Sequence, residues 1–189
     1  TLYGAAKVFG EGLLRSYHDM YGTDYVCLRF FNVYGPRMDI HGKYTEVLIR
    51  WMERLDAGEP PLIFGDGKQT LDMVHVRDVA RSCVLSAIAP ASDVALNVGS
   101  GTETSLYQLC RALAEVMGRA DIEPEFLADR PINPVSKRQA DITLARQLIG
   151  FDAVVPLADG LRELVQWWRD ERAHGAFSQA SREKAGIGS

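Results

Sequence analysis

The feature that most constrains this chain is an alternation between segments of helical and of strand periodicity. Apolar residues recur at helical spacing over residues 2–21, and a nearly continuous apolar run follows at 25–33. A run rich in β-branched and aromatic residues is typical of a strand buried on both faces. Because the same alternation continues to about residue 172, the sequence predicts an α/β fold with a parallel sheet.

Turn and capping residues set the expected element boundaries. Gly22 would end the first helix, Thr45 would begin the next, and Ser105 and Gln108 have the spacing of a capping box. Further helices are expected near 77–89, 141–148 and 157–172, and short strands near 61–64, 70–75, 95–98 and 122–126. The Asp66-Gly67 pair between two of these strands predicts a hairpin.

Composition excludes several classes of protein. The net charge is −4 with the two signs interspersed, so no basic face is offered to a nucleic acid. No apolar run approaches the roughly 20 residues of a membrane helix, and no secretory leader is present, which favours the cytoplasm. The four histidines lack metal-ligand spacing. Cys27, Cys83 and Cys110 are odd in number and widely spaced, so we expect small buried hydrophobes rather than disulfides.

One pair of side chains within the first predicted helix has chemical potential. Tyr3 and Lys7 are four residues apart, so both lie on one helical face about a turn from each other. A free phenol has a pKa of about 10, and a nearby cation lowers the pKa of a phenol toward the working range of a general base. A helix-start aromatic beside a solvated lysine has the same spacing, so the pair alone selects no function.

The context of this pair is more specific. Ordered blocks along the chain resemble the extended short-chain dehydrogenase/reductase family, which includes the nucleotide-sugar epimerases and dehydratases, over roughly residues 2–170. The blocks are Tyr3-Gly-Ala-Ala-Lys7, Leu28-Arg-Phe-Phe-Asn-Val-Tyr-Gly-Pro-Arg37, Phe64-Gly-Asp-Gly-Lys-Gln-Thr70, Asp72-Met-Val-His-Val-Arg-Asp-Val-Ala80, Leu96-Asn-Val-Gly-Ser-Gly101 and Lys137-Arg-Gln-Ala-Asp141.

The resemblance implies the carboxy-terminal part of a Rossmann-type parallel sheet plus a small α/β substrate-binding domain. Residues 1–36 would be the remnant of the dinucleotide-binding domain. Residues 37–174 would form mainly the substrate-binding domain, with 94–118 returning to the Rossmann sheet. Residues 175–189 are polar and are expected to form a disordered tail.

The resemblance also implies roles for residues near the reacting carbon. Tyr3 would be the acid/base at the sugar 4-hydroxyl while hydride passes from C4 to the nicotinamide of NAD, with NADP left open. Lys7 would hold the nicotinamide ribose and favour the phenolate form of Tyr3. Phe31 would lie near the nicotinamide, and Asn32 would contact the sugar nucleotide.

A second set of implied roles concerns the UDP- or dTDP-type part of the substrate. The strand residues Leu62, Ile63 and Phe64 would flank the nucleobase. Arg138 would bind the pyrophosphate, for which a guanidinium is a suitable planar donor, and Asp141 would read or support a nearby hydroxyl.

Two positions depart from the family pattern. Leu71 stands where many relatives carry an arginine that binds phosphate, and Met73 stands where an aromatic residue is usual. The phosphate contact would then be weakened, or shared with Arg37, Lys43 or Arg77.

The expected dinucleotide cradle is a further departure. No glycine-rich strand-turn-helix matches, and we interpret Gly99-Ser100-Gly101 as a tight turn, with Thr104 in place of the third glycine. The family's catalytic serine or threonine upstream of Tyr3 has no counterpart either. The chain opens at Thr1 without an initiator methionine, so we expect part of a longer protein, inactive by itself and with weak affinity for NAD.

These features favour a parent protein that interconverts nucleotide-diphosphate sugars by oxidation at C4, with 4-epimerisation preferred. A 4,6-dehydratase or a decarboxylase would share nearly every named residue. A non-catalytic nucleotide-sugar-binding module is the alternative of another class, and Leu71 is its best support. The resemblance also implies a homodimer through the Tyr3–Lys7 helix, whose Phe9, Leu13 and Leu14 would contribute an apolar stripe.

Overall fold

The structure is a computed structural model that describes residues 1–40, 47–128 and 137–175. Its helices are α1 (Leu2–Tyr21), α2 (Val47–Ala57), α3 (Val76–Ile88), α4 (Leu106–Met117), α5 (Thr143–Ile149) and α6 (Leu157–Ala173). Its strands are β1 (Val26–Phe30), β2 (Asn32–Tyr34), β3 (Leu62–Phe64), β4 (Thr70–Leu71), β5 (Met73–His75), β6 (Val94–Val98), β7 (Thr104–Ser105) and β8 (Glu125–Leu127).

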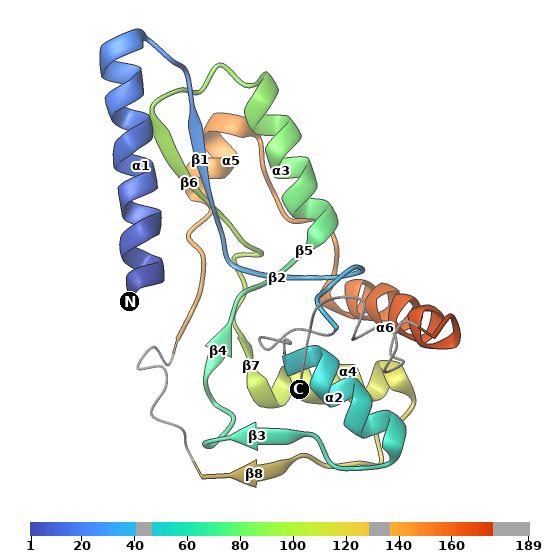
Figure 1. The fold of residues 1–189 in the computed structure, drawn as a ribbon. Coiled ribbons are helices and arrows are strands. Elements are labelled where there is room, and N and C mark those ends of the chain that lie inside the picture. The colour runs from blue at the N-terminus through green and yellow to red at the C-terminus, as the bar shows by residue number, and fades with distance from the viewer. Residues whose placement is uncertain (41–46, 129–136, 176–189) are drawn as a thin grey trace.

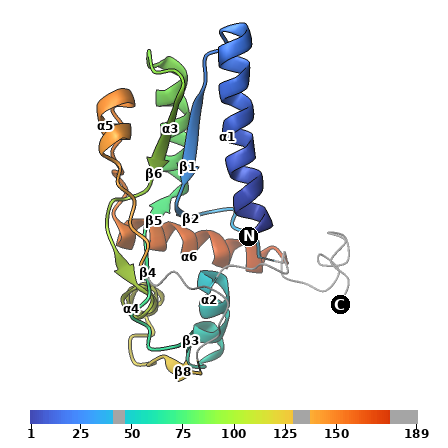
Figure 2. The same ribbon diagram turned by 90° about the vertical axis from the view of Figure 1, so that its left-hand side faces the viewer.

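The two longest strands, β1 and β6, form a parallel pair at one end of the molecule. Val26 is paired with Val94 and Phe30 with Val98. Helices α3 and α5 pack on one side of this pair, and α1 stands on the other side (Figures 1 and 2). A small apolar core lies under the packed side. It consists of residues of β5, β6, α3 and α5, such as Leu96, and of Phe151, which follows α5.

The chain changes sheet partner between Phe30 and Asn32. The Phe31 amide donates to the Val98 carbonyl at 2.9 Å, and the Asn32 amide donates to the Asp72 carbonyl at 3.0 Å. Strand β2 is therefore paired with β5, in parallel, rather than with β6. The single strand predicted at 25–33 is thus two strands. The neighbouring strands diverge at the carboxyl end of β1, where the chain changes partner.

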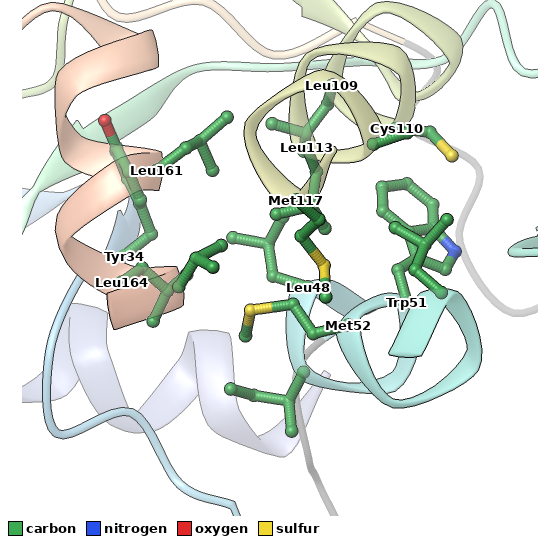
Figure 3. Close-up of a cluster of buried hydrophobic side chains, with 14 of the residues drawn as sticks. Tyr34, Leu48, Trp51, Met52, Leu109, Cys110, Leu113, Met117, Leu161 and Leu164 are labelled. Carbon is green, nitrogen blue, oxygen red and sulfur yellow. The ribbon is translucent and has the colours of Figure 1, made fainter. Parts of the chain in front are cut away.

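The larger core belongs to the other end of the molecule. Helices α2, α4 and α6 bury apolar side chains against one another, together with the side chain of Tyr34 from β2 (Figure 3). The parallel pair β3–β8 and the antiparallel pair β4–β7 border this core. Ser105 and Gln108 form the predicted capping box at the start of α4, and Gly118 in the left-handed conformation ends it.

Helix α1 differs from the other long helices in its packing. Thr1 caps its start and Gly22, with φ of 65°, ends it, as the sequence predicts for Gly22. None of its residues is buried within the described chain. Its side chains include the exposed apolar residues Leu2, Val8, Phe9, Leu13, Leu14 and Met20, which we call the α1 stripe.

The prediction of an α/β fold with parallel strands is confirmed, and three local predictions besides the single strand at 25–33 are wrong. The turn at Asp66-Gly67 does not form a hairpin, because β3 is paired with β8 and β4 with β7. Strand β1 is not buried on both faces, since Arg29 and Phe30 are exposed. Cys83 is exposed and Cys27 half-buried, so only Cys110 is the buried hydrophobe expected of all three.

Several expectations fall on residues outside the described ones: the cap at Thr45, the roles suggested for Lys43, and the tail from 176 onward. None of the helices in the described part of the chain combines the length and the apolar character of a membrane span. No cluster of His, Cys, Asp or Glu that could hold a metal ion occurs in the same part of the chain.

Candidate active site

Tyr3 and Lys7 lie on the first two turns of α1, whose beginning is fixed by the Thr1 hydroxyl accepting from the Gly4 amide at 3.1 Å. The Lys7 ammonium lies 5.2 Å from the centre of the Tyr3 ring, a cation–π distance. Tyr3 is 73% exposed, and within the described residues Lys7 forms no ion pair. The phenol and the ammonium are thus brought together, as predicted, and both remain open to a ligand.

The start of α1 lies at the end of the sheet where β1 gives way to β2 (Figures 1 and 2). Ligands of open α/β sheets bind outside the carboxyl ends of the strands, where neighbouring strands diverge. Phe31 and Asn32 occupy that divergence, and both are half-buried. The structure thus brings the residues predicted to act at the reacting carbon to one end of the β1–β6 pair.

The three residues predicted to flank a nucleobase have different surroundings. Leu62 and Phe64 line a cavity of about 460 Å³ together with Val47, Arg50, Trp51, Glu53 and Arg54. Ile63, between them, is 1% exposed and belongs to the larger core. Alternate residues of a strand point to opposite faces, so Leu62 and Phe64 can reach a ligand in this cavity and Ile63 supports the strand.

Arg138 and Asp141 lie on the segment that leads into α5. The Arg138 amide donates to the Thr70 hydroxyl at 3.3 Å, which places its backbone beside β4. The Asp141 carboxylate accepts from the Thr143 amide at 3.0 Å, and hydrogen bonds from Thr143 hold the pKa of Asp141 below its usual value. Asp141 is therefore an ionised acceptor at the beginning of α5, still exposed to solvent.

The turn Gly99-Ser100-Gly101 after β6 proves not to be a phosphate cradle. The amides of Ser100 and Gly101 donate to the buried Asp72 carboxylate at 2.6 and 2.9 Å. In a dinucleotide-binding loop these amides would face the pyrophosphate. The interpretation of this sequence as a tight turn is confirmed.

Asp72 is the residue that the sequence reasoning missed. It was part of a family block, but no role followed from its type alone, because its four donors come from segments distant in the sequence. A usable signal was the small residue at 99: a Cβ there would lie 2.5 Å from the Ala140 Cβ and 2.9 Å from an Asp72 oxygen.

The two departures from the family pattern have structural consequences. Leu71 is half-buried and packs against the larger core, and Met73 is buried. Of the cations suggested as substitutes for the missing arginine, Arg77 forms an ion pair with Glu163 and Arg37 sits at a positive φ of 70°. Arg77 is therefore already paired with an acid.

A buried polar cluster joins the ends of β2 and β5 to α6. The His75 ring meets Tyr34 edge-on at 5.3 Å between ring centres, and its Nε2 lies 3.6 Å from the Glu163 carboxylate. Burial lowers the pKa of His75, opposed by the charge of Glu163, and burial raises the pKa of Tyr34. His75 Nδ1 accepts from the Arg77 amide at 3.3 Å and so caps α3.

A protein-family match covers about the first half of the chain, from α1 to the end of β6. Residues 1–99 match the NAD dependent epimerase/dehydratase family. The chain belongs to this family. The family that the ordered sequence blocks predict is thereby confirmed. The matched residues include the two positions, Leu71 and Met73, that depart from the family pattern.

Relatives and solved structures agree with this assignment. The chain is 38% identical over 169 residues to UDP-glucose 4-epimerase of Mycolicibacterium smegmatis, a match that covers 89% of this chain and 53% of that protein. It is 31% identical to dTDP-glucose 4,6-dehydratase of Streptomyces niveus, over 90% of this chain and 49% of that one.

Two solved structures that resemble the chain were determined with bound ligands. UDP-glucose 4-epimerase of Thermotoga maritima with UDP-glucose superposes with a TM-score of 0.83 at 36% identity, covering 90% of this chain and 54% of that one. UDP-glucuronic acid 4-epimerase of Bacillus cereus with UDP-glucuronic acid and NAD superposes with a TM-score of 0.77 at 29% identity, covering 89% and 52%. The chain thus spans about half the length of the relatives it matches.

Proposed function

We propose that this chain supplies the proton-transfer pair and the sugar-nucleotide site of an NAD-dependent nucleotide-sugar 4-epimerase. The observation that carries the proposal is the open Tyr3–Lys7 pair at the start of α1, at the same end of the β1–β6 pair as Phe31 and Asn32. Similarity to proteins named as 4-epimerases supports the choice of reaction.

The residues present fit a nicotinamide cofactor and a sugar at this position. The Lys7 ammonium and the Tyr3 hydroxyl are exposed donors on one helical face, as ribose and sugar hydroxyls require. When bound, the cofactor supplies hydride acceptance and return. Tyr3 is a phenolate when it takes the proton of the sugar 4-hydroxyl and a neutral phenol when it gives the proton back, and the positive charge of Lys7 stabilises the phenolate form.

The remaining contacts orient the nucleotide. Arg138 binds the pyrophosphate with its guanidinium, and Asp141 accepts from a nearby hydroxyl. Leu62 and Phe64 flank the base in the cavity that they line, with Ile63 behind them. Asn32 contacts the sugar nucleotide from the start of β2, and Phe31 borders the nicotinamide.

The proposal extends to the domain organisation and the oligomeric state of the protein. Residues 1–36 and β6 (Val94–Val98) belong to a dinucleotide-binding domain together with α3 and α5, which pack against β1 and β6, and most of the rest of 37–174 forms the substrate-binding domain. The expected assignment of the whole range 94–118 to the dinucleotide-binding sheet is corrected for α4, whose buried side chains lie in the larger core with those of α2 and α6. The exposed α1 stripe is the homodimer contact. Location in the cytoplasm stays a prediction, as does the inactivity of these residues alone.

Product analysis tests the reaction. The full-length gene product is incubated with NAD and UDP-glucose, and the sugar product is identified by NMR. We expect UDP-galactose, formed by inversion at C4. A 4-keto-6-deoxy sugar from UDP- or dTDP-glucose would instead assign a dehydratase, and loss of carbon dioxide from UDP-glucuronate a decarboxylase. Binding of UDP-glucose without any turnover would favour the non-catalytic module.

A further inference from the structure

The buried carboxylate of Asp72 connects three segments that are far apart in the sequence. Its Oδ1 accepts from the Ser100 amide at 2.6 Å and from the Ser100 hydroxyl at 2.8 Å. Its Oδ2 accepts from the Gly101 and Ala140 amides, each at 2.9 Å. Asp72 is 0% exposed, and a buried charge is tolerated when several donors surround it in this way.

The segment of Ala140 carries two proposed substrate contacts, and the backbone of Asp72 is bonded to a third. Ala140 lies between Arg138 and Asp141, and the backbone of Asp72 itself accepts from the Asn32 amide at 3.0 Å. The turn after β6 is linked to the same segment a second time, because the side-chain amide Nε2 of Gln139 donates to the Gly101 carbonyl at 2.7 Å. Asn97, on β6, donates to the Asp141 carbonyl at 3.1 Å.

We infer that Asp72 is a positioning residue of the sugar-nucleotide site, because its carboxylate fixes the Arg138 segment relative to the strand that carries Asn32. The inference rests on the proposed function, which assigns Arg138 to the pyrophosphate. Within residues 137–141, the Ala140 amide is bonded to Asp72 itself, and the Arg138 amide to Thr70, two residues before Asp72. Two further bonds of this segment lead to Gly101, which also donates to Asp72, and to Asn97 of β6. Close approach of Ala140 is possible only because residue 99 is glycine.

The chain offers a matched control for this role. Asp78, on the first turn of α3, is 1% exposed, and its carboxylate accepts from the Val154 amide at 3.1 Å and from the Val155 amide at 3.0 Å. It is thus a second buried carboxylate that holds a distant loop, here the approach to α6. No proposed substrate contact lies on that loop.

Binding of UDP to the chain, followed by isothermal titration, separates the two roles. The variants are Asp72→Asn, Asp78→Asn, Arg138→Ala and the Asp72→Asn/Arg138→Ala double variant, with thermal unfolding measured on each. An asparagine keeps the shape of Asp72 but turns an amide group toward amide donors. We expect Asp72→Asn to raise the Kd for UDP roughly tenfold, the size of one charge-assisted contact.

The pattern across variants decides the inference. Arg138→Ala should raise the Kd similarly, and the double variant should lose little more than Arg138→Ala alone, because Asp72 acts through Arg138. Asp78→Asn should lower the melting temperature and leave the Kd unchanged. If Asp72→Asn binds UDP like the parent while Arg138→Ala does not, the positioning role is overturned and the proposed function stands. If Arg138→Ala binds UDP like the parent, the phosphate assignment fails, and the inference fails with it.

A milder variant covers the case in which Asp72→Asn does not fold. Ser100→Ala removes one of the four donors to Asp72. We expect the Kd for UDP to rise about two- to threefold, because the variant loses about one neutral hydrogen bond. Hydrogen exchange gives a second measurement: the Ala140 amide should exchange faster in Ser100→Ala, and the Val154 amide should not. Unchanged exchange at Ala140 together with an unchanged Kd would overturn the role of Asp72.

Discussion

Helices α1 and α4 are both capped at their starts and both end in a left-handed glycine, yet they are held in place by different forces. The 20 residues of α1 include none that is buried, whereas the 12 residues of α4 bury Leu109, Cys110, Leu113, Ala114 and Met117. Since most helical stability in proteins comes from packing, α1 depends on its caps and on whatever covers its stripe, and α4 on the core. The proposed chemistry lies on the uncovered helix.

The sharpest contrast is expected from removing one large apolar side chain from each helix. Leu113 in α4 is 0% exposed, so Leu113→Ala should lower the free energy of unfolding by about 2–5 kcal/mol through lost burial and a cavity. Phe9→Ala in α1 is the matched control, and its effect should stay within about 0.5 kcal/mol when it is measured on the monomer, at a protein concentration too low for the proposed dimer. Urea unfolding followed by circular dichroism measures both. Equal losses would show that α1 is packed in the isolated chain.

Replacing one glycine by alanine in a packed helix, α6, and one in α1 should change the stability of the chain in opposite directions. A Cβ on Gly160 of α6 would overlap the Tyr34 hydroxyl, so Gly160→Ala should destabilise the chain by about 1–3 kcal/mol. A Cβ on Gly12 of α1 meets nothing within 4 Å, so Gly12→Ala should stabilise it by about 0.4–1 kcal/mol through higher helix propensity. Thermal unfolding of both variants suffices. A destabilised Gly12→Ala chain would contradict the uncovered state of α1.

A smaller effect should arise from pH at the junction of the two halves. Burial lowers the pKa of His75 in the folded chain, so the unfolded chain binds the proton more readily. The folded chain should therefore be most stable above the unfolded pKa of about 6.5 and lose stability as pH falls below it. Urea midpoints measured from pH 5 to 8 should show this slope. His75→Asn, which retains a capping acceptor for α3, should flatten it.

If the slope persists unchanged in His75→Asn, another group is responsible. Groups that face His75 are Tyr34 of β2, Arg77 and Asp78 of α3, and Glu163 of α6. Glu163→Gln then separates the ion pair from burial: it removes the charge that opposes the lowered pKa of His75, and so should steepen the slope rather than remove it.

Local signals made most elements predictable from the sequence. Gly22, Gly118 and the Ser105–Gln108 box act within a few residues of the backbone they control, and the structure places each as expected. The Tyr3–Lys7 contact was equally local, because a helix alone brings residues four apart together. The resemblance supplied what lay beyond such short distances.

Long-range pairing was not predictable in the same way. Asp66-Gly67 has the residue types of a hairpin turn, but β8 and β7, far along the chain, provide the partners of β3 and β4. The apolar run at 25–33 predicts burial on both faces, because its composition does not reveal that α1 leaves side chains of β1 exposed. Likewise, Asp72 could be assigned only once Ser100, Gly101 and Ala140 were seen around it.

Proton exchange by Tyr3 is the central claim, and its most direct test compares two tyrosines of the same helix. Tyr3→Phe and Tyr21→Phe each remove one exposed phenol from α1 of the full-length gene product, and conversion of UDP-glucose is measured with NAD present. Loss of a general acid/base should lower kcat by about 10²–10⁴ in Tyr3→Phe, with Tyr21→Phe unaffected. Undiminished conversion by Tyr3→Phe would contradict the mechanism.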